Sequence, residues 1–174
     1  LNAKTLEESA LPVIAYLLEE RGGPAPKSRG MDPIDNFTDT FTHLKGQTLA
    51  PLVKRHYESL NAFLDGKSDE FLEHWHEGPD SVLYFNLSER ERGGENIRLT
   101  FRQVRAVLSR VPVGTILTPL QVQYVECGDV AYAITMEKAI SELDRRTVVS
   151  EHRGTLIWRK FDGHWKLVHM HNDT

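Results

Sequence analysis

The sequence predicts a single α+β domain in which helices come first and an uninterrupted antiparallel sheet follows. Between residues 48 and 108, apolar residues recur mostly at helical spacing. From residue 115 onward, four stretches rich in β-branched and aromatic residues follow without an intervening helical pattern. The dipeptide Asp162-Gly163 separates the last two stretches and is typical of a tight hairpin turn. Helices followed by an antiparallel meander are the element order of an α+β fold.

Length and composition limit the functional classes. A chain of 174 residues suits one domain that buries about 70% of its unfolded surface. The net charge of −4 and the lack of a clustered basic segment argue against nucleic-acid binding. No apolar run approaches the length of a membrane span. We therefore expect a cytoplasmic protein, and the start at Leu1 is also compatible with a processed export signal.

The first 46 residues form a separate unit in this interpretation. Leu11, Ile14, Leu17 and Leu18 recur at helical spacing, and 22–24 (Gly-Gly-Pro) stops the helix. We expect residues 1–46 to be a helical arm and linker that packs on the domain or on a partner subunit. An independent function of the arm is the alternative.

Residues 47–174 form the predicted domain. A long helix over 49–64 carries a broad apolar stripe and is closed by Gly66. Ser68 caps a short second helix, and 82–85 is a short strand followed by a turn or ragged strand pair. Thr100 is the expected cap of a third helix.

Four strands are predicted over 115–126, 130–143, 147–160 and 165–171. With the last turn centred on Asp162-Gly163, an unbroken ladder pairs Trp158 with Leu167, Leu156 with His169, and Gly154 with His171. One face of this hairpin then carries both histidines. The opposite face carries an apolar strip of Ile157, Val168 and Met170, which predicts a homodimer through the sheets.

The closing hairpin resembles that of a known family. A strand ending in Trp158-Arg-Lys, an Asp-Gly turn and the run Trp-Lys-Leu-Val-His-Met-His over 165–171 are similar to the nuclear transport factor 2-like (SnoaL-like) cone fold. The resemblance is strongest to the association domain of calcium/calmodulin-dependent protein kinase II and its bacterial relatives. It implies a curved antiparallel sheet wrapped around a long helix, with a ligand-binding or catalytic hollow between them and a dimer interface on the other sheet face.

His169 and His171 are the predicted catalytic residues. An imidazole partly buried in an apolar pocket can titrate near neutrality and act as a general base or acid. The alternative is that both histidines make structural hydrogen bonds at a sheet edge or dimer interface. Carboxylates are weaker candidates, because Glu137 has the opposite parity from the apolar residues of its strand and Glu126 ends its strand.

The predicted ligand-binding residues are those expected to line the hollow around His169. They are Leu156, Trp158, Tyr132, Ile134, Met136, Tyr57, Phe63 and Tyr84. The resemblance aligns two pocket arginines of the kinase association domain with Leu156 and the vicinity of Ile134. Both positions are aliphatic here, so we expect a neutral, apolar or aromatic ligand rather than an anion.

No cofactor and no metal is predicted. Of the two His-x-His pairs, the one at 169/171 has Asp173 as its only obvious third ligand. The pair at 74/76 lies on a predicted helical stretch, where residues two apart do not face each other. Cys127 is the single cysteine, which excludes an intramolecular disulfide and a cysteine-rich metal site.

The functional prediction is a homodimeric small-molecule-binding domain with an apolar pocket. If it is an enzyme, the expected class is a cofactor-independent isomerase, cyclase or dehydratase. The alternative is a non-catalytic oligomerisation or accessory hub. An open hollow would favour ligand binding, and a hollow filled by side chains would favour the hub.

Overall fold

A computed structural model describes residues 49–85, 88–109, 114–143 and 146–173, and the predicted arm 1–46 lies outside these ranges. The helices are α3 (Ala50–Leu64), α4 (Glu70–Glu73) and α5 (Gly94–Leu108). The strands are β1 (Val82–Phe85), β2 (Ser88–Arg92), β3 (Gly114–Cys127), β4 (Val130–Leu143), β5 (Arg146–Phe161) and β6 (His164–Asp173). These elements confirm the predicted α+β fold and the four long strands.

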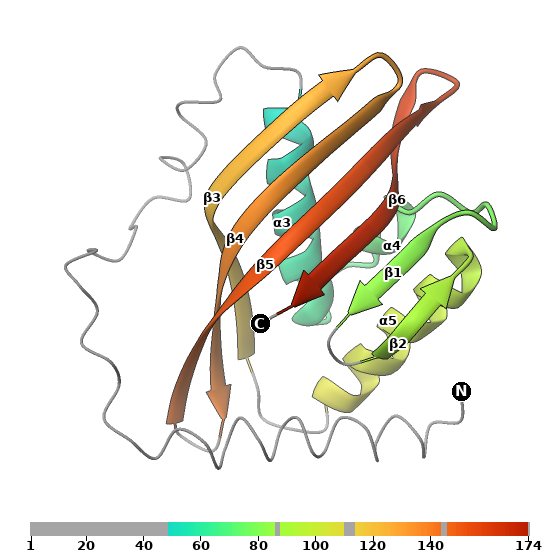
Figure 1. The fold of residues 1–174 in the computed structure, drawn as a ribbon. Helices are drawn as coiled ribbons and strands as arrows, with labels where there is room; N and C mark the ends of the chain where they lie inside the picture. Colours follow the sequence, from blue (N-terminus) through green and yellow to red (C-terminus); the bar gives the residue numbers. More distant parts are fainter. Residues whose placement is uncertain (1–48, 86–87, 110–113, 144–145, 174) are drawn as a thin grey trace.

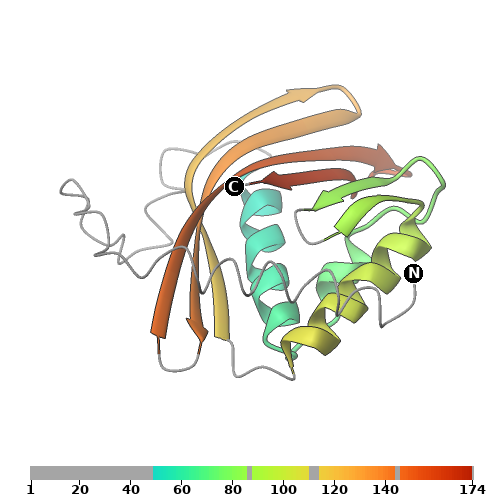
Figure 2. The same cartoon turned by 60° about the horizontal axis from the view of Figure 1, so that its bottom comes forward.

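The strands form one six-stranded sheet in the order β2-β1-β6-β5-β4-β3 (Figure 1). The pairs from β3 to β6 are antiparallel, as expected. The sheet is mixed rather than purely antiparallel, because β1 runs parallel to β6. Figure 2 shows the long strands curving over α3, which lies on the concave side of the sheet. The face toward α3 is called the concave face below, and the opposite one the outer face.

Helix α3 is held at its end and along its length. Gly66 has a φ of 73°, and Lys67 N donates to the carbonyl of Ala62, which closes the helix as predicted. Asn61 donates from Nδ2 to the carbonyl of Leu117 at 2.8 Å and accepts from Leu117 N at 2.9 Å. Because β3 is an edge strand, this amide satisfies backbone groups that have no strand partner. Asn61 therefore fixes the helix against the sheet.

Helix α5 begins at Gly94, well before the predicted cap Thr100. Ile97 N donates to the carbonyl of Gly93, and Ile97 is buried together with Phe101. The apolar stripe thus extends one turn further toward the N-terminus, and Thr100 is a buried residue inside the helix.

The core lies between α3, α4, α5 and the concave face. Its largest fully buried side chains are Trp75, Trp158, Tyr57, Phe63, Phe71, Phe101, Leu49, Leu83, Ile97, Leu156, Leu167 and His56. Phe71 is the centre of an aromatic group, with its ring 4.8 Å from that of Phe101 and 5.7 Å from that of Phe63. Side chains of the protein therefore fill the region between these helices and the sheet.

The closing hairpin contains a β-bulge that corrects the predicted register. The turn is as expected, with positive φ at Asp162 and Gly163, and Trp158 does pair with Leu167. The next pair, however, is Ile157 with His169, which leaves Val168 without a partner. Beyond the bulge, Leu156 pairs with Met170 and Gly154 with Asn172, instead of with His169 and His171. A single extra residue moves every following side chain to the other face.

Candidate functional site

The bulge places His169 and His171 on the outer face, so the predicted position of both in the hollow is wrong. His169 is half-buried opposite Ile157, and His171 is exposed opposite Thr155. The ring of Tyr84 lies 6.0 Å from that of His169 and 5.8 Å from that of His171. Tyr84 therefore belongs to the same outer surface and does not close over the hollow.

The two faces of β4 are also the reverse of the prediction. Tyr132, Ile134 and Met136, all expected in the pocket, lie on the outer face, and Tyr132 and Ile134 are 39% and 51% exposed. The buried residues of this strand are Ala131, Ala133, Thr135, Glu137 and Ala139. Small side chains on the concave face leave room for α3 and for the large residues of β5, since Ala131 pairs with Trp158.

Four of the predicted lining residues do lie under the sheet. Leu156 and Trp158 are on the concave face, and Tyr57 and Phe63 approach it from α3. Leu156, Trp158 and Phe63 are packed into the core. Tyr57 is different, because its hydroxyl contacts a polar group.

That polar group is Glu137, whose side chain lies on the concave face and is 2% exposed. Its Oε1 accepts hydrogen bonds from the Tyr57 hydroxyl and the Thr135 hydroxyl, both at 2.7 Å. Its Oε2 accepts one from Asn172 Nδ2 at 2.8 Å. The three donors come from α3, β4 and β6, so the tertiary fold assembles the site.

Gly154 provides the space for this arrangement. It lies opposite Thr135 in the ladder between β4 and β5. A Cβ at Gly154 would lie 2.3 Å from Thr135 Oγ1 and 2.4 Å from Glu137 Oε1, which is closer than atoms can approach. The missing side chain therefore lets the carboxylate lie across β5.

All three partners of Glu137 are neutral donors. Burial, together with the negative charge of Glu137, raises the pKa of Tyr57 well above its usual value, so the phenol stays protonated. Within the described ranges, no lysine or arginine forms an ion pair with Glu137. A buried carboxylate without a cation is costly, and such groups are concentrated at functional sites. The arrangement can accept a hydrogen bond or a proton.

Parity alone could not identify Glu137. One face of the strand carries mostly small residues, such as Ala133 and Thr135, together with Glu137, and the other face carries larger residues, such as Tyr132 and Ile134. The prediction placed the larger residues in the interior, so it placed the Glu137 carboxylate on the outer face. The available signal was the size complementarity of adjacent strands, because a long helix over a sheet and large residues on β5 require small residues on β4.

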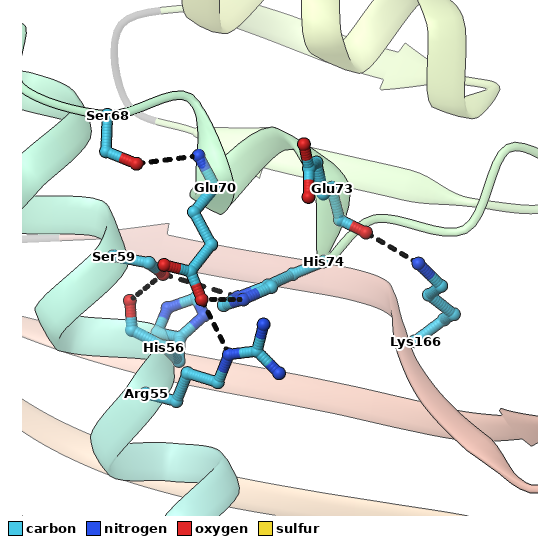
Figure 3. Close-up of polar contacts among 8 residues, drawn as sticks. All are labelled: Arg55, His56, Ser59, Ser68, Glu70, Glu73, His74 and Lys166. Atoms are coloured by element: carbon cyan, nitrogen blue, oxygen red, sulfur yellow. Dashed lines mark hydrogen bonds and ion pairs between the residues drawn. The ribbon is translucent and has the colours of Figure 1, made fainter.

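A second polar cluster joins α3 to α4 (Figure 3). Arg55 Nε donates to Glu70 Oε1 at 2.7 Å. The ring of His74 lies between Glu70 and Ser59. Its Nε2 is 3.6 Å from Glu70 Oε1, and its Nδ1 is 3.3 Å from Ser59 Oγ. Lys166 donates to the carbonyl of Glu73 at 2.7 Å. Most of these contacts are partly exposed and fasten one element to another, so we assign the cluster a structural role.

The described residues contain no group of three His, Cys, Asp or Glu side chains suited to a metal ion. The helices that the structure describes are also too short or too polar to cross a membrane.

Comparison with solved structures finds the same fold in proteins of low sequence identity. A candidate calcium/calmodulin-dependent protein kinase II association domain from Xanthomonas campestris is 18% identical, covers 71% of this chain and 83% of its own, and has a TM-score of 0.56. A candidate ketosteroid isomerase from Shewanella frigidimarina is 21% identical, covers 69% of this chain and 93% of its own, and has a TM-score of 0.53.

A third similar structure, from Catenulispora acidiphila, is a complex with S-DNPA. It is 17% identical, covers 71% of this chain and 91% of its own, and has a TM-score of 0.57. No curated protein matches this sequence. Residues 56–172 match the SnoaL-like domain, and this segment includes most of α3, strands β1 to β5, β6 up to its penultimate residue, and the Glu137 cluster. The chain therefore belongs to the SnoaL-like domain family, and it has the fold of nuclear transport factor 2-like structures.

Proposed function

We propose that this chain is a small-molecule-binding domain in which Glu137 anchors the ligand and exchanges a proton with it. The buried carboxyl group carries this proposal, because it is 2% exposed and its hydrogen-bond partners in the described part of the chain are all neutral donors. Similar structures include one in complex with S-DNPA and a candidate isomerase.

The ligand chemistry follows from the surroundings of Glu137. The carboxylate can accept a hydrogen bond from a hydroxyl group or a proton from an acidic C–H group. On β5, burial decreases from Leu156 and Gly154 toward His152 and Ser150, so a ligand would approach from the Ser150 side. A neutral molecule with one polar group fits best, since no cation of the site would pair with an anion. Isomerisation, cyclisation and dehydration all require such a positioned base.

The Glu137→Gln substitution is expected to weaken ligand binding by about tenfold or more, because the amide cannot take up a proton and loses one acceptor oxygen. S-DNPA and a set of neutral aromatic alcohols and ketones are the probes, with tryptophan fluorescence and thermal shift as readouts. His171→Gln is the matched control, since His171 lies exposed on the outer face. Equal binding by Glu137→Gln and the wild type would contradict the proposal.

A hub function is the second candidate, and the outer face favours it. Two rows of side chains cross this face, Val125-Tyr132-Ile157-His169 and Gln123-Ile134-Thr155-His171-Tyr84. Several are large and exposed hydrophobic residues, which on a soluble surface usually mark an interface. Of the predicted strip, Ile157 remains on this face, whereas Met170 is buried on the concave one.

We expect a two-fold dimer through the outer face. Ile134→Glu should shift the protein to monomer at micromolar concentration, because it places charges at the centre of the apolar contact. Leu99→Glu is the matched control: Leu99 is also 51% exposed but lies on α5. Light scattering measures both, and a monomeric wild-type protein would contradict the expectation.

A further inference from the structure

His152 lies beside Glu137 and has one unused ring nitrogen. The two residues are directly opposite each other in the ladder between β4 and β5, so both side chains project from the concave face. The Cβ atoms of such pairs are about 4.5–5.5 Å apart. His152 Nε2 lies 2.8 Å from Ser150 Oγ, whereas Nδ1 is buried without a hydrogen-bond partner among the described residues.

The other neighbours of Glu137 cannot exchange protons near neutral pH. Thr135 and Asn172 do not titrate, and the pKa of Tyr57 is raised. These residues and α3 separate the carboxylate from solvent. His152 and Ser150 are only half-buried, so they lie on the more exposed side of the site.

We propose that His152 is the proton-exchange partner of Glu137, with Ser150 holding its ring in place. This inference rests on the proposed function of Glu137. When Glu137 has taken a proton from the ligand, one water between the two side chains relays a proton from the carboxyl O–H to the free lone pair on His152 Nδ1, because no direct hydrogen bond joins these groups in the described residues. The imidazolium then releases its Nε2 proton through Ser150 Oγ to solvent, and Glu137 returns to a carboxylate. One proton moves in each step and no electrons are transferred.

The charges around His152 are consistent with this role. Burial lowers the pKa of His152, while the negative charges of Glu137 on β4 and Asp173 on β6 act in the opposite direction. The ring is therefore neutral at pH 7.5 and able to accept a proton.

The test is an NMR pH titration of the histidine rings in the full-length protein without ligand. We expect neutral His152 to be the Nε2–H tautomer. Glu137→Gln should lower its titration midpoint by about half a pH unit or more, because a nearby negative charge is removed. Glu151→Gln is the matched control, since it makes the same chemical change on an exposed neighbouring residue of β5. Ser150→Ala should weaken the tautomer preference.

Two results would overturn the inference. One is a shift of the His152 titration midpoint in Glu137→Gln that is no larger than in Glu151→Gln. The other is an Nδ1–H tautomer of His152 in the wild type. Should the Glu137→Gln variant fail to fold, the tautomer of the wild-type His152 ring gives a second and independent reading. The probe-binding experiment separates the two proposals. If Glu137 affects the titration of His152 but no probe binds, the proposed function is refuted. If a probe binds but Glu137 does not affect the titration of His152, only the role of His152 is refuted.

Discussion

Acidification is expected to destabilise this protein steeply, with His56 as the principal cause. His56 is buried in the core between Tyr57, Phe71 and Trp158, and neither of its ring nitrogens has a hydrogen-bond partner in the described part of the chain. Burial, with a smaller contribution from the charge of His74, lowers the pKa of His56 from 6.5 to about 3. The folded protein therefore keeps this ring neutral under conditions in which the unfolded chain protonates it.

The sign follows from proton linkage. Between pH 6.5 and about 3 the unfolded state binds the extra proton, so the free energy of unfolding falls as the pH is lowered through this window. The slope of the free energy of unfolding is about 1.4 kcal/mol per pH unit, and the total loss over this window is on the order of 5 kcal/mol. Above pH 6.5 His56 is neutral in both the folded and the unfolded state, so the protein has its full stability with respect to this group. The lowered pKa of His74 and that of His169 act in the same direction.

Urea unfolding at a series of pH values measures this effect. His56→Leu should flatten the pH dependence and leave stability at pH 7.5 unchanged or higher, because it removes two buried nitrogens that have no partners. His164→Gln is the control, since His164 is exposed next to the hairpin turn. Equal slopes for His56→Leu and the wild type would show that His56 is not the cause.

Leu156→Arg is expected to destabilise the protein by several kcal/mol, or to prevent folding. Leu156 is 1% exposed and pairs with Ala133 on one side and Met170 on the other. The side chain of Ala133 has no hydrogen-bond acceptor and the thioether of Met170 is only a weak one, so neither compensates a buried guanidinium charge. In the kinase association domain that the hairpin resembles, the aligned position is an arginine, so this substitution also tests how far the resemblance extends.

Leu156→Met is the matched control, because it keeps an apolar side chain of similar volume and should cost less than about 1.5 kcal/mol. Thermal melts and urea unfolding compare the three proteins. An arginine variant as stable as the methionine variant would show that this end of the concave face admits solvent or a counter-ion.

Much of the fold could be predicted because local chemistry determines it. The spacing of apolar residues defined α3, Gly66 marked its end, and Asp162-Gly163 marked the last turn. The four long strands followed from β-branched and aromatic residues between turn signals. Periodicity also separated the residues of each strand into two sets, and that division is correct on β4.

What the sequence by itself did not determine is which set faces α3. Tyr132 and Ile134 look like interior residues, but close approach of the helix requires the small residues of β4 and brings Glu137 inside. The bulge at Val168 had the same kind of effect on β6, because a strand can shift by one residue to bury Met170 and expose His171. Sequence determines the period of a strand, whereas only packing across α3, β4, β5 and β6 decides its face, because that choice depends on the volumes of residues far apart in the chain.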